Sequence, residues 1–208
     1  MIPYLKNPKD IYRRSFEIIA AEAEFSMLPA SARAIATRVI HSCGMVEITS
    51  DLVITPDFAE ATSKALIAGR PILVDVEMVR HGIIARFLPE NCKIICTLND
   101  PRASELGLSH STTRTAVAVS LWREHLEGAI VVIGNAPTAL FALLEMIDAG
   151  PPKPASIVAM PVGFVGAAES KAELIANPRG IPFATIKGRK GGSAMASSVI
   201  NALTDVTQ

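Results

Sequence analysis

The chain has 208 residues, half of them apolar, and its 20 basic and 20 acidic side chains give a formal net charge of zero. This length predicts a single domain, residues 1–208, that can bury enough surface to fold without added crosslinks. The balanced charge argues against general nucleic-acid or membrane-surface binding, and an aromatic content of 5% argues against a stacking platform for single strands.

The cysteine count is odd, which indicates reduced thiols in a cytoplasmic protein (Cys43, Cys92 and Cys96). Residues 1–10 show no basic region followed by an apolar one, so we expect no signal peptide. Residues 129–147 are apolar over about the length of a membrane span, but Gly134, Asn135 and Pro137 interrupt them. That interruption indicates a buried strand, a turn and a helix, so we expect no membrane partner.

Two helices are predicted first, over residues 8–25 and 28–42. Asn7 and Pro8 suit the start of the first helix, and Gly44 follows the end of the second. Residues 46–55 form a weaker candidate strand.

Strands and helices then alternate along the rest of the chain. The predicted strands are short, β-branched and apolar, as in a sheet buried on both faces (71–76, 93–98, 129–134, 156–161 and 182–187). One helix is predicted before these strands, and the others lie between or after them (57–68, 110–124, 136–149, 166–176 and 192–204). The pattern predicts an α/β protein: a doubly wound, mainly parallel sheet with helices on both faces, preceded by two N-terminal helices.

Ligands of such sheets bind beyond the carboxyl ends of the strands, so the loops that follow the strands are the candidate sites. The loop after residues 182–187 carries cations and glycines at a helix start, and it predicts a carboxylate or phosphate site (Lys187, Arg189, Lys190, Gly191, Gly192 and Ser193). Its spacing is not that of a nucleotide-binding P-loop. An ordinary exposed loop explains the same residues equally well.

Two further helix starts are candidate ligand contacts. Asn135 lies in a tight turn and either faces a ligand or caps the following helix. Thr112 and Arg114 open another helix, where the arginine could bind a carboxylate or be simply solvated. The dinucleotide fingerprint is missing and His81 has no second histidine or cysteine pair nearby, so we expect neither a cofactor nor a metal.

Arg38 and His41 are three residues apart, which places both on one face of the second helix. Arg14 and Ser15 lie in the first helix, so a site between the two helices could combine these side chains. Taken alone, a histidine in such an apolar stretch is more often a hydrogen-bonded core residue than a catalyst.

Several segments together resemble the precorrin-8X methylmutase family: "RVIHSCG" (38–44), "STTRTA" (111–116), "IGNAPTALFALLE" (133–145), "PASIVAMPVGFVGAAESK" (154–171) and "IKGRKGGSAMASS" (186–198). The resemblance extends over roughly residues 5–204. It implies a homodimeric isomerase that moves a methyl group from carbon 11 to carbon 12 of a corrinoid, giving hydrogenobyrinic acid without a cofactor. It places the catalytic proton donor at His41 and substrate contacts at Ser15 and Arg38.

Three alternatives stay open at this point. The substrate could be cobalt-precorrin-8 instead of the metal-free compound, because the metal belongs to the substrate. A non-catalytic tetrapyrrole-binding protein would share the fold and the anion-binding loops. Without the resemblance, an enzyme acting on a phosphate ligand would also suit the glycine-rich loop. Met45 departs from the family pattern, in which an acid often follows the glycine; the first acid here is Glu47.

Overall fold

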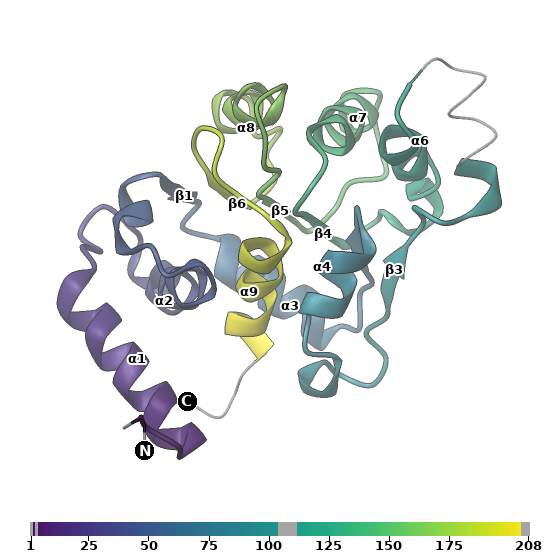
Figure 1. Ribbon diagram of the computed structural model, residues 1–208. Helices are drawn as coiled ribbons and strands as arrows, with labels where there is room; N and C mark the ends of the chain where they lie inside the picture. Colours follow the sequence, from purple (N-terminus) through teal and green to yellow (C-terminus); the bar gives the residue numbers. More distant parts are fainter. Residues whose placement is uncertain (1, 3, 104–111, 205–208) are drawn as a thin grey trace.

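The computed structural model describes residues 2, 4–103 and 112–204. Six strands form one sheet in the order β1-β6-β5-β4-β2-β3 (Figure 1). Their bounds are β1 Leu52–Ile54, β2 Ile72–Val74, β3 Ile94–Cys96, β4 Ile130–Ile133, β5 Ser156–Ala159 and β6 Phe183–Ile186. All neighbouring strands are parallel except β1, which pairs antiparallel with β6. The predicted α/β class and mainly parallel sheet are confirmed.

Helices cover both faces of this sheet, with α6, α7 and α8 on one side and α2, α3, α4 and α9 on the other (Figure 1). Their bounds are α1 Pro8–Glu22, α2 Arg33–Cys43, α3 Phe58–Ile67, α4 Glu77–Gly82, α6 Arg114–Ser120, α7 Pro137–Asp148, α8 Ala167–Ala176 and α9 Ser193–Thr204. The two N-terminal helices precede the sheet as predicted, and α1 packs against α2. Among the residues placed by the structure, no helix is both long and apolar enough to cross a membrane.

Each central strand supplies side chains to two separate cores. In β4, Ile130 and Val132 belong to the core under α2 and α9, while Val131 and Ile133 belong to the core under α7 and α8. This alternation follows from the two-residue repeat of a strand. It explains why the buried strands have continuous apolar sequences.

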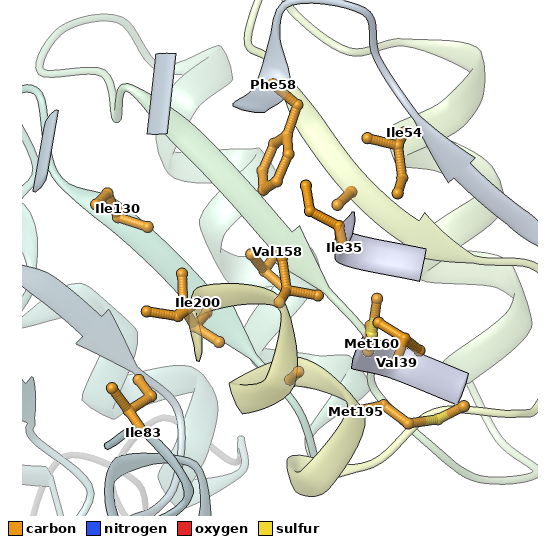
Figure 2. Close-up of a cluster of buried hydrophobic side chains, with 14 of the residues drawn as sticks. Ile35, Val39, Ile54, Phe58, Ile83, Ile130, Val158, Met160, Met195 and Ile200 are labelled. Atoms are coloured by element: carbon orange, nitrogen blue, oxygen red, sulfur yellow. The ribbon is translucent and has the colours of Figure 1, made fainter. Parts of the chain in front are cut away.

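Helix α9 lies in the middle of the first core. Figure 2 shows Met195 and Ile200 of α9 among the side chains of the sheet and of α2, including Val39 and Val158. The carboxyl-terminal half of α2 therefore packs beside the first turns of α9. This packing brings the end of α2 toward the end of the sheet from which α9 begins.

The candidate strand over residues 46–55 was mostly wrong. Residues Val46–Ser50 form a 3-10 turn, and only Leu52–Ile54 pair with the sheet. The hydroxyls of Thr49 and Ser50 donate to the carbonyls of Val46 and Glu47. Such local bonds compete with strand pairing.

Two N-terminal boundaries also differ from the prediction. Helix α1 ends at Glu22 rather than residue 25, because the Glu24 carboxylate accepts a bond from the Ser26 amide and holds a turn there. Helix α2 begins at Arg33, after a 3-10 turn over Ala30–Ala32.

Two helices farther along the chain also depart from the prediction. The helix predicted over 110–124 is shorter, Arg114–Ser120, with a 3-10 turn over Arg123–His125; its first two residues lie outside the described part. Helix α4 was not predicted.

Candidate functional site

His41 lies in the last turn of α2 against two aromatic rings of α1. Its ring centroid is 5.4 Å from that of Tyr12 and 5.3 Å from that of Phe16. The guanidinium carbon of Arg38 lies 5.9 Å and 5.5 Å from the centres of the same two rings. The predicted pairing of Arg38 and His41 on one helix face is therefore present. The aromatic walls were missed, although Tyr12 and Phe16 have the i, i+4 spacing that places them together.

The surroundings of His41 favour its neutral form. Burial lowers the pKa of the imidazole, and the positive charge of Arg38 lowers it further. A neutral imidazole offers one donor and one acceptor nitrogen, so it can exchange a proton with a bound ligand. The apolar walls and the nearby cation thus keep the imidazole neutral, and a bound anionic ligand would favour its protonated form.

The other predicted residues of the first helix occupy different positions. Ser15 is partly buried on α1, one residue before Phe16. Arg14 is exposed, and its guanidinium lies 3.4 Å from the Glu17 carboxylate on the same helix. Such an exposed pair adds little to stability and leaves the arginine available to a ligand.

The loop of residues 187–192 connects β6 to α9 at the carboxyl edge of the sheet. Lys187 and Arg189 are exposed, and the Lys190 ammonium lies 3.2 Å from the Asp51 carboxylate. The charge of Lys190 also acts on the Cys43 thiol, two residues after His41. The Lys187 amide also donates to the Asp51 carbonyl at 2.8 Å, so the loop contacts the segment that follows α2.

Gly191 is required by the close approach of this loop to the end of β5. Its φ is 156°, and an added Cβ would lie 2.3 Å from the Met160 carbonyl oxygen. The amide of Gly192 donates to the same oxygen at 2.8 Å. Ser193 begins α9 as predicted, and its buried hydroxyl has no hydrogen-bond partner among the residues placed by the structure.

A buried lysine supports the loop from the opposite face of the sheet. Lys171 of α8 is fully buried, and its ammonium donates to the Lys190 carbonyl at 2.5 Å. Burial lowers the pKa of this ammonium to about 8. The sequence reasoning did not single out Lys171, because a lysine near a loop is normally solvated.

We expect the unfolding free energy of the wild type to depend on pH differently from that of the Lys171→Met variant, which lacks the buried ammonium. The unfolded chain keeps the ordinary lysine pKa of 10.5, so between about 8 and 10.5 it binds more protons than the folded chain. As pH rises from about 8 to 10.5, the unfolding free energy of the wild type should therefore rise relative to that of the variant; below about 8 both states carry the proton, so the difference should become constant. Urea unfolding of both proteins measures this; a difference that does not change with pH contradicts it.

Asp75 fixes the point where the strand order reverses, between β2 and β4. Its buried carboxylate accepts hydrogen bonds from the amides of Gly134, Asn135 and Ala136, at 3.0, 2.9 and 2.8 Å. Burial raises the pKa of this carboxyl, and the three amides oppose the rise. The idea that Asn135 caps α7 was wrong, because Ala136 occupies the cap position and Asp75 supplies the oxygen atoms.

The remaining predicted contacts lie beside this turn. The hydroxyls of Thr113 and Thr115 bond to that of Thr138 in the first turn of α7, at 2.8 and 3.1 Å. This contact joins the starts of α6 and α7. Thr112 and Arg114, next to it, are exposed.

Two loops of the candidate site meet at the carboxyl edge of the sheet. Gly134 packs so closely on Ser193 that an added Cβ would lie 2.9 Å from the Ser193 Cα, which joins the loops after β4 and β6. In the described part of the chain, no group of three metal-ligating side chains is placed to hold an ion.

The fold is that of a doubly wound α/β protein, with two groups of candidate ligand contacts: an aromatic one at His41 and a cationic one at the glycine-rich loop. The chain belongs to the precorrin-8X methylmutase family, whose sequence profile it matches over residues 10–206. It is 53% identical over 203 residues to the Pseudomonas aeruginosa "Precorrin-8X methylmutase", with 98% of each chain covered.

Two other similarities extend the comparison. The Priestia megaterium "Cobalt-precorrin-8 methylmutase" is 34% identical, over 97% of this chain and 89% of that protein. The crystal structure of the Thermus thermophilus precorrin-8X methylmutase superposes with a TM-score of 0.84 at 34% identity, covering 94% of each chain. The fold and the family that the sequence motifs indicated are confirmed.

Proposed function

We propose that this isomerase of corrin biosynthesis moves a methyl group from carbon 11 to carbon 12 of precorrin-8X, with His41 as proton donor. Membership of the family supports the reaction, since the matched profile covers residues 10–206. The single observation that supports His41 is its position: an imidazole in the last turn of a helix, packed against the rings of Tyr12 and Phe16.

The chemistry needs only polarisation of the conjugated macrocycle. A proton placed on a ring nitrogen draws electrons from the conjugated system, so the methyl group can migrate to the adjacent carbon and the proton is then returned. Imidazole is the side chain suited to proton transfer near neutrality. A positioned general acid of this kind contributes about 10²–10⁴-fold to the rate.

The rest of the site suits the shape and charge of the substrate. The aromatic walls at His41 match an apolar macrocycle, while the cations and backbone amides at the sheet edge match its carboxylate arms. We assign substrate contacts to the residues predicted from the sequence: Arg14, Ser15, Arg38, Thr112, Arg114, Asn135, Lys187, Arg189, Lys190, Gly191, Gly192 and Ser193.

The lowered pKa of His41 predicts how the rate depends on pH. Because a proton donor must be protonated, kcat/KM should fall as pH rises, with a midpoint below the ordinary histidine value of 6.5. Removal of the Arg38 charge in the Arg38→Gln variant should move this midpoint to higher pH, whatever its effect on KM. A pH profile of both proteins measures the shift, and an unmoved or lowered midpoint contradicts the role of Arg38.

The metal-free substrate is favoured over its cobalt form. The relative with 53% identity is named for precorrin-8X, whereas the relative named for cobalt-precorrin-8 is 34% identical. Incubation with each compound, followed by mass and visible spectrum, tests the proposal. Isomerisation changes the chromophore and leaves the mass unchanged; tight binding of both compounds without spectral conversion would indicate a tetrapyrrole carrier instead.

We further propose a homodimer in the cytoplasm. The family resemblance supports the dimer, and so does the outer side of α1, where Ile11 and Tyr12 are 43% and 47% exposed. Tyr12 also contacts His41, so a partner on this face would lie close to the site. The free thiols of Cys43, Cys92 and Cys96 support a reducing compartment. Light scattering measures the mass in solution.

A further inference from the structure

The loop that follows β5 exposes three apolar side chains at its tip, residues 162–165. Phe164 is 81% exposed, Val165 is 89% exposed and Val162 is 42% exposed. Single exposed apolar residues are common on proteins, but contiguous ones usually mark a binding surface. The tip lies at the carboxyl edge of the sheet, where ligands of this fold bind.

This apolar tip is anchored on both sides. The Gly163 amide donates to the Arg189 carbonyl at 3.2 Å, which joins the tip to the glycine-rich loop. On the other side, Gly166 has a φ of 81°, and an added Cβ would lie 3.2 Å from the Pro137 side chain of α7. The exposed side chains are therefore presented from a backbone tied to two neighbouring elements.

The tip borders the cations of the neighbouring loop. The guanidinium carbon of Arg189 lies 5.1 Å from the centre of the Phe164 ring. Lys190 is paired with Asp51, which leaves Lys187 and Arg189 as the exposed positive charges of that loop. An apolar surface beside exposed cations is complementary to a flat apolar molecule that carries carboxylates.

We propose that the apolar tip, residues 162–165, is a platform for one face of the corrinoid macrocycle, with Arg189 joining the Phe164 ring to a carboxylate arm. This inference rests on the proposed function and adds a specificity-determining element to it. The occupant is the corrinoid rather than a second copy of the chain, because it supplies the apolar face and the carboxylates in one molecule. Phe164 and Val165 contact the substrate in this arrangement; they do not take part in proton transfer.

Binding of hydrogenobyrinic acid to the Phe164→Ala and Val165→Ser variants tests the platform. In the proposed complex the substrate covers the Phe164 side chain, and burial of so large an apolar group contributes substantially to binding. Phe164→Ala should therefore raise Kd and KM about tenfold or more, with kcat nearly unchanged. Val165→Ser should have a smaller effect in the same direction. Ile67→Ala is the matched control, since Ile67 is an apolar residue 78% exposed on α3, and it should leave both constants unchanged.

The outcomes separate this inference from the function on which it rests. A wild type that neither converts precorrin-8X nor binds the product contradicts the proposed function. A wild type that does both, with Phe164→Ala binding equally well, overturns the platform alone. Light scattering tests whether the tip instead contacts a second copy of the chain. If Phe164→Ala changes the mass in solution while its Kd for the product does not rise, the tip is a contact between copies and the platform is overturned.

Discussion

The His41→Ala variant should convert precorrin-8X about 10²–10⁴-fold more slowly than the wild type. The reason is that the only acid proposed for the macrocycle is removed, while the aromatic walls and the cationic loop that we propose as substrate contacts are kept. Formation of hydrogenobyrinic acid, followed by its visible spectrum, measures kcat. Binding of the same product to the variant should weaken much less than kcat falls, because the carboxylate arms keep their partners.

Two further variants make this result specific. His41→Gln retains a polar side chain of similar size between Tyr12 and Phe16 but cannot donate a proton as an acid, so it should be as slow as His41→Ala. His81→Ala removes a histidine whose side chain is 80% exposed on α4, and it should leave kcat unchanged. Turnover by His41→Gln within a few-fold of the wild type would exclude His41 as the proton donor.

The Asp75→Asn variant should lower the free energy of unfolding by about 3 kcal/mol, the largest stability effect we expect. An asparagine at this position keeps the volume of the side chain. It replaces one carboxylate oxygen, which accepts from backbone amides in the wild type, with an NH2 group that cannot accept a hydrogen bond. At least one buried amide among Gly134, Asn135 and Ala136 then has no acceptor, and such groups are costly to leave unsatisfied. Urea unfolding monitored by circular dichroism measures the change.

Asp57→Ala is the control for Asp75. Asp57 also stands at the start of a helix, α3, but it is exposed and its side chain makes no capping bond. Its removal should change stability by less than about 0.5 kcal/mol. Equal effects of the two substitutions would mean that the carboxylate of Asp75 does not fix the turn between β4 and α7.

The strands and the outer helices were predictable because their patterns are local. Continuous apolar runs such as residues 129–134 allow few structures other than a buried strand, and Asn7 caps α1 with its side chain as expected. The strand over residues 46–55 was misjudged because its hydroxyls form local bonds that a periodicity argument does not include. Helix α4 was missed because its six residues are too short to show a repeat.

The candidate site was only partly predictable, because its contacts join distant segments. The pairing of Arg38 and His41 follows from helix geometry, whereas Lys171 reaches the Lys190 carbonyl across the sheet edge. Asp75 could not be assigned from the sequence, because its partners lie 59 to 61 residues later and come close only when β2 and β4 are neighbours in the sheet. Phe164 lies in a segment that carries the family resemblance, residues 154–171, but no local pattern there indicates that its side chain is exposed.

The antiparallel pairing of β1 with β6 has a consequence for the order in which the enzyme is made. Leu52–Ile54 pair with Ala184–Ile186, so the first strand to be synthesised has its partner only when the last one arrives. The contacts of α2 with α9 are equally distant in sequence. His41 and its aromatic neighbours in α1 are therefore synthesised early, whereas the glycine-rich loop and α9 are added only at the end. Such distant pairings also slow folding, so the nascent chain contains the proposed proton donor well before the candidate site is complete.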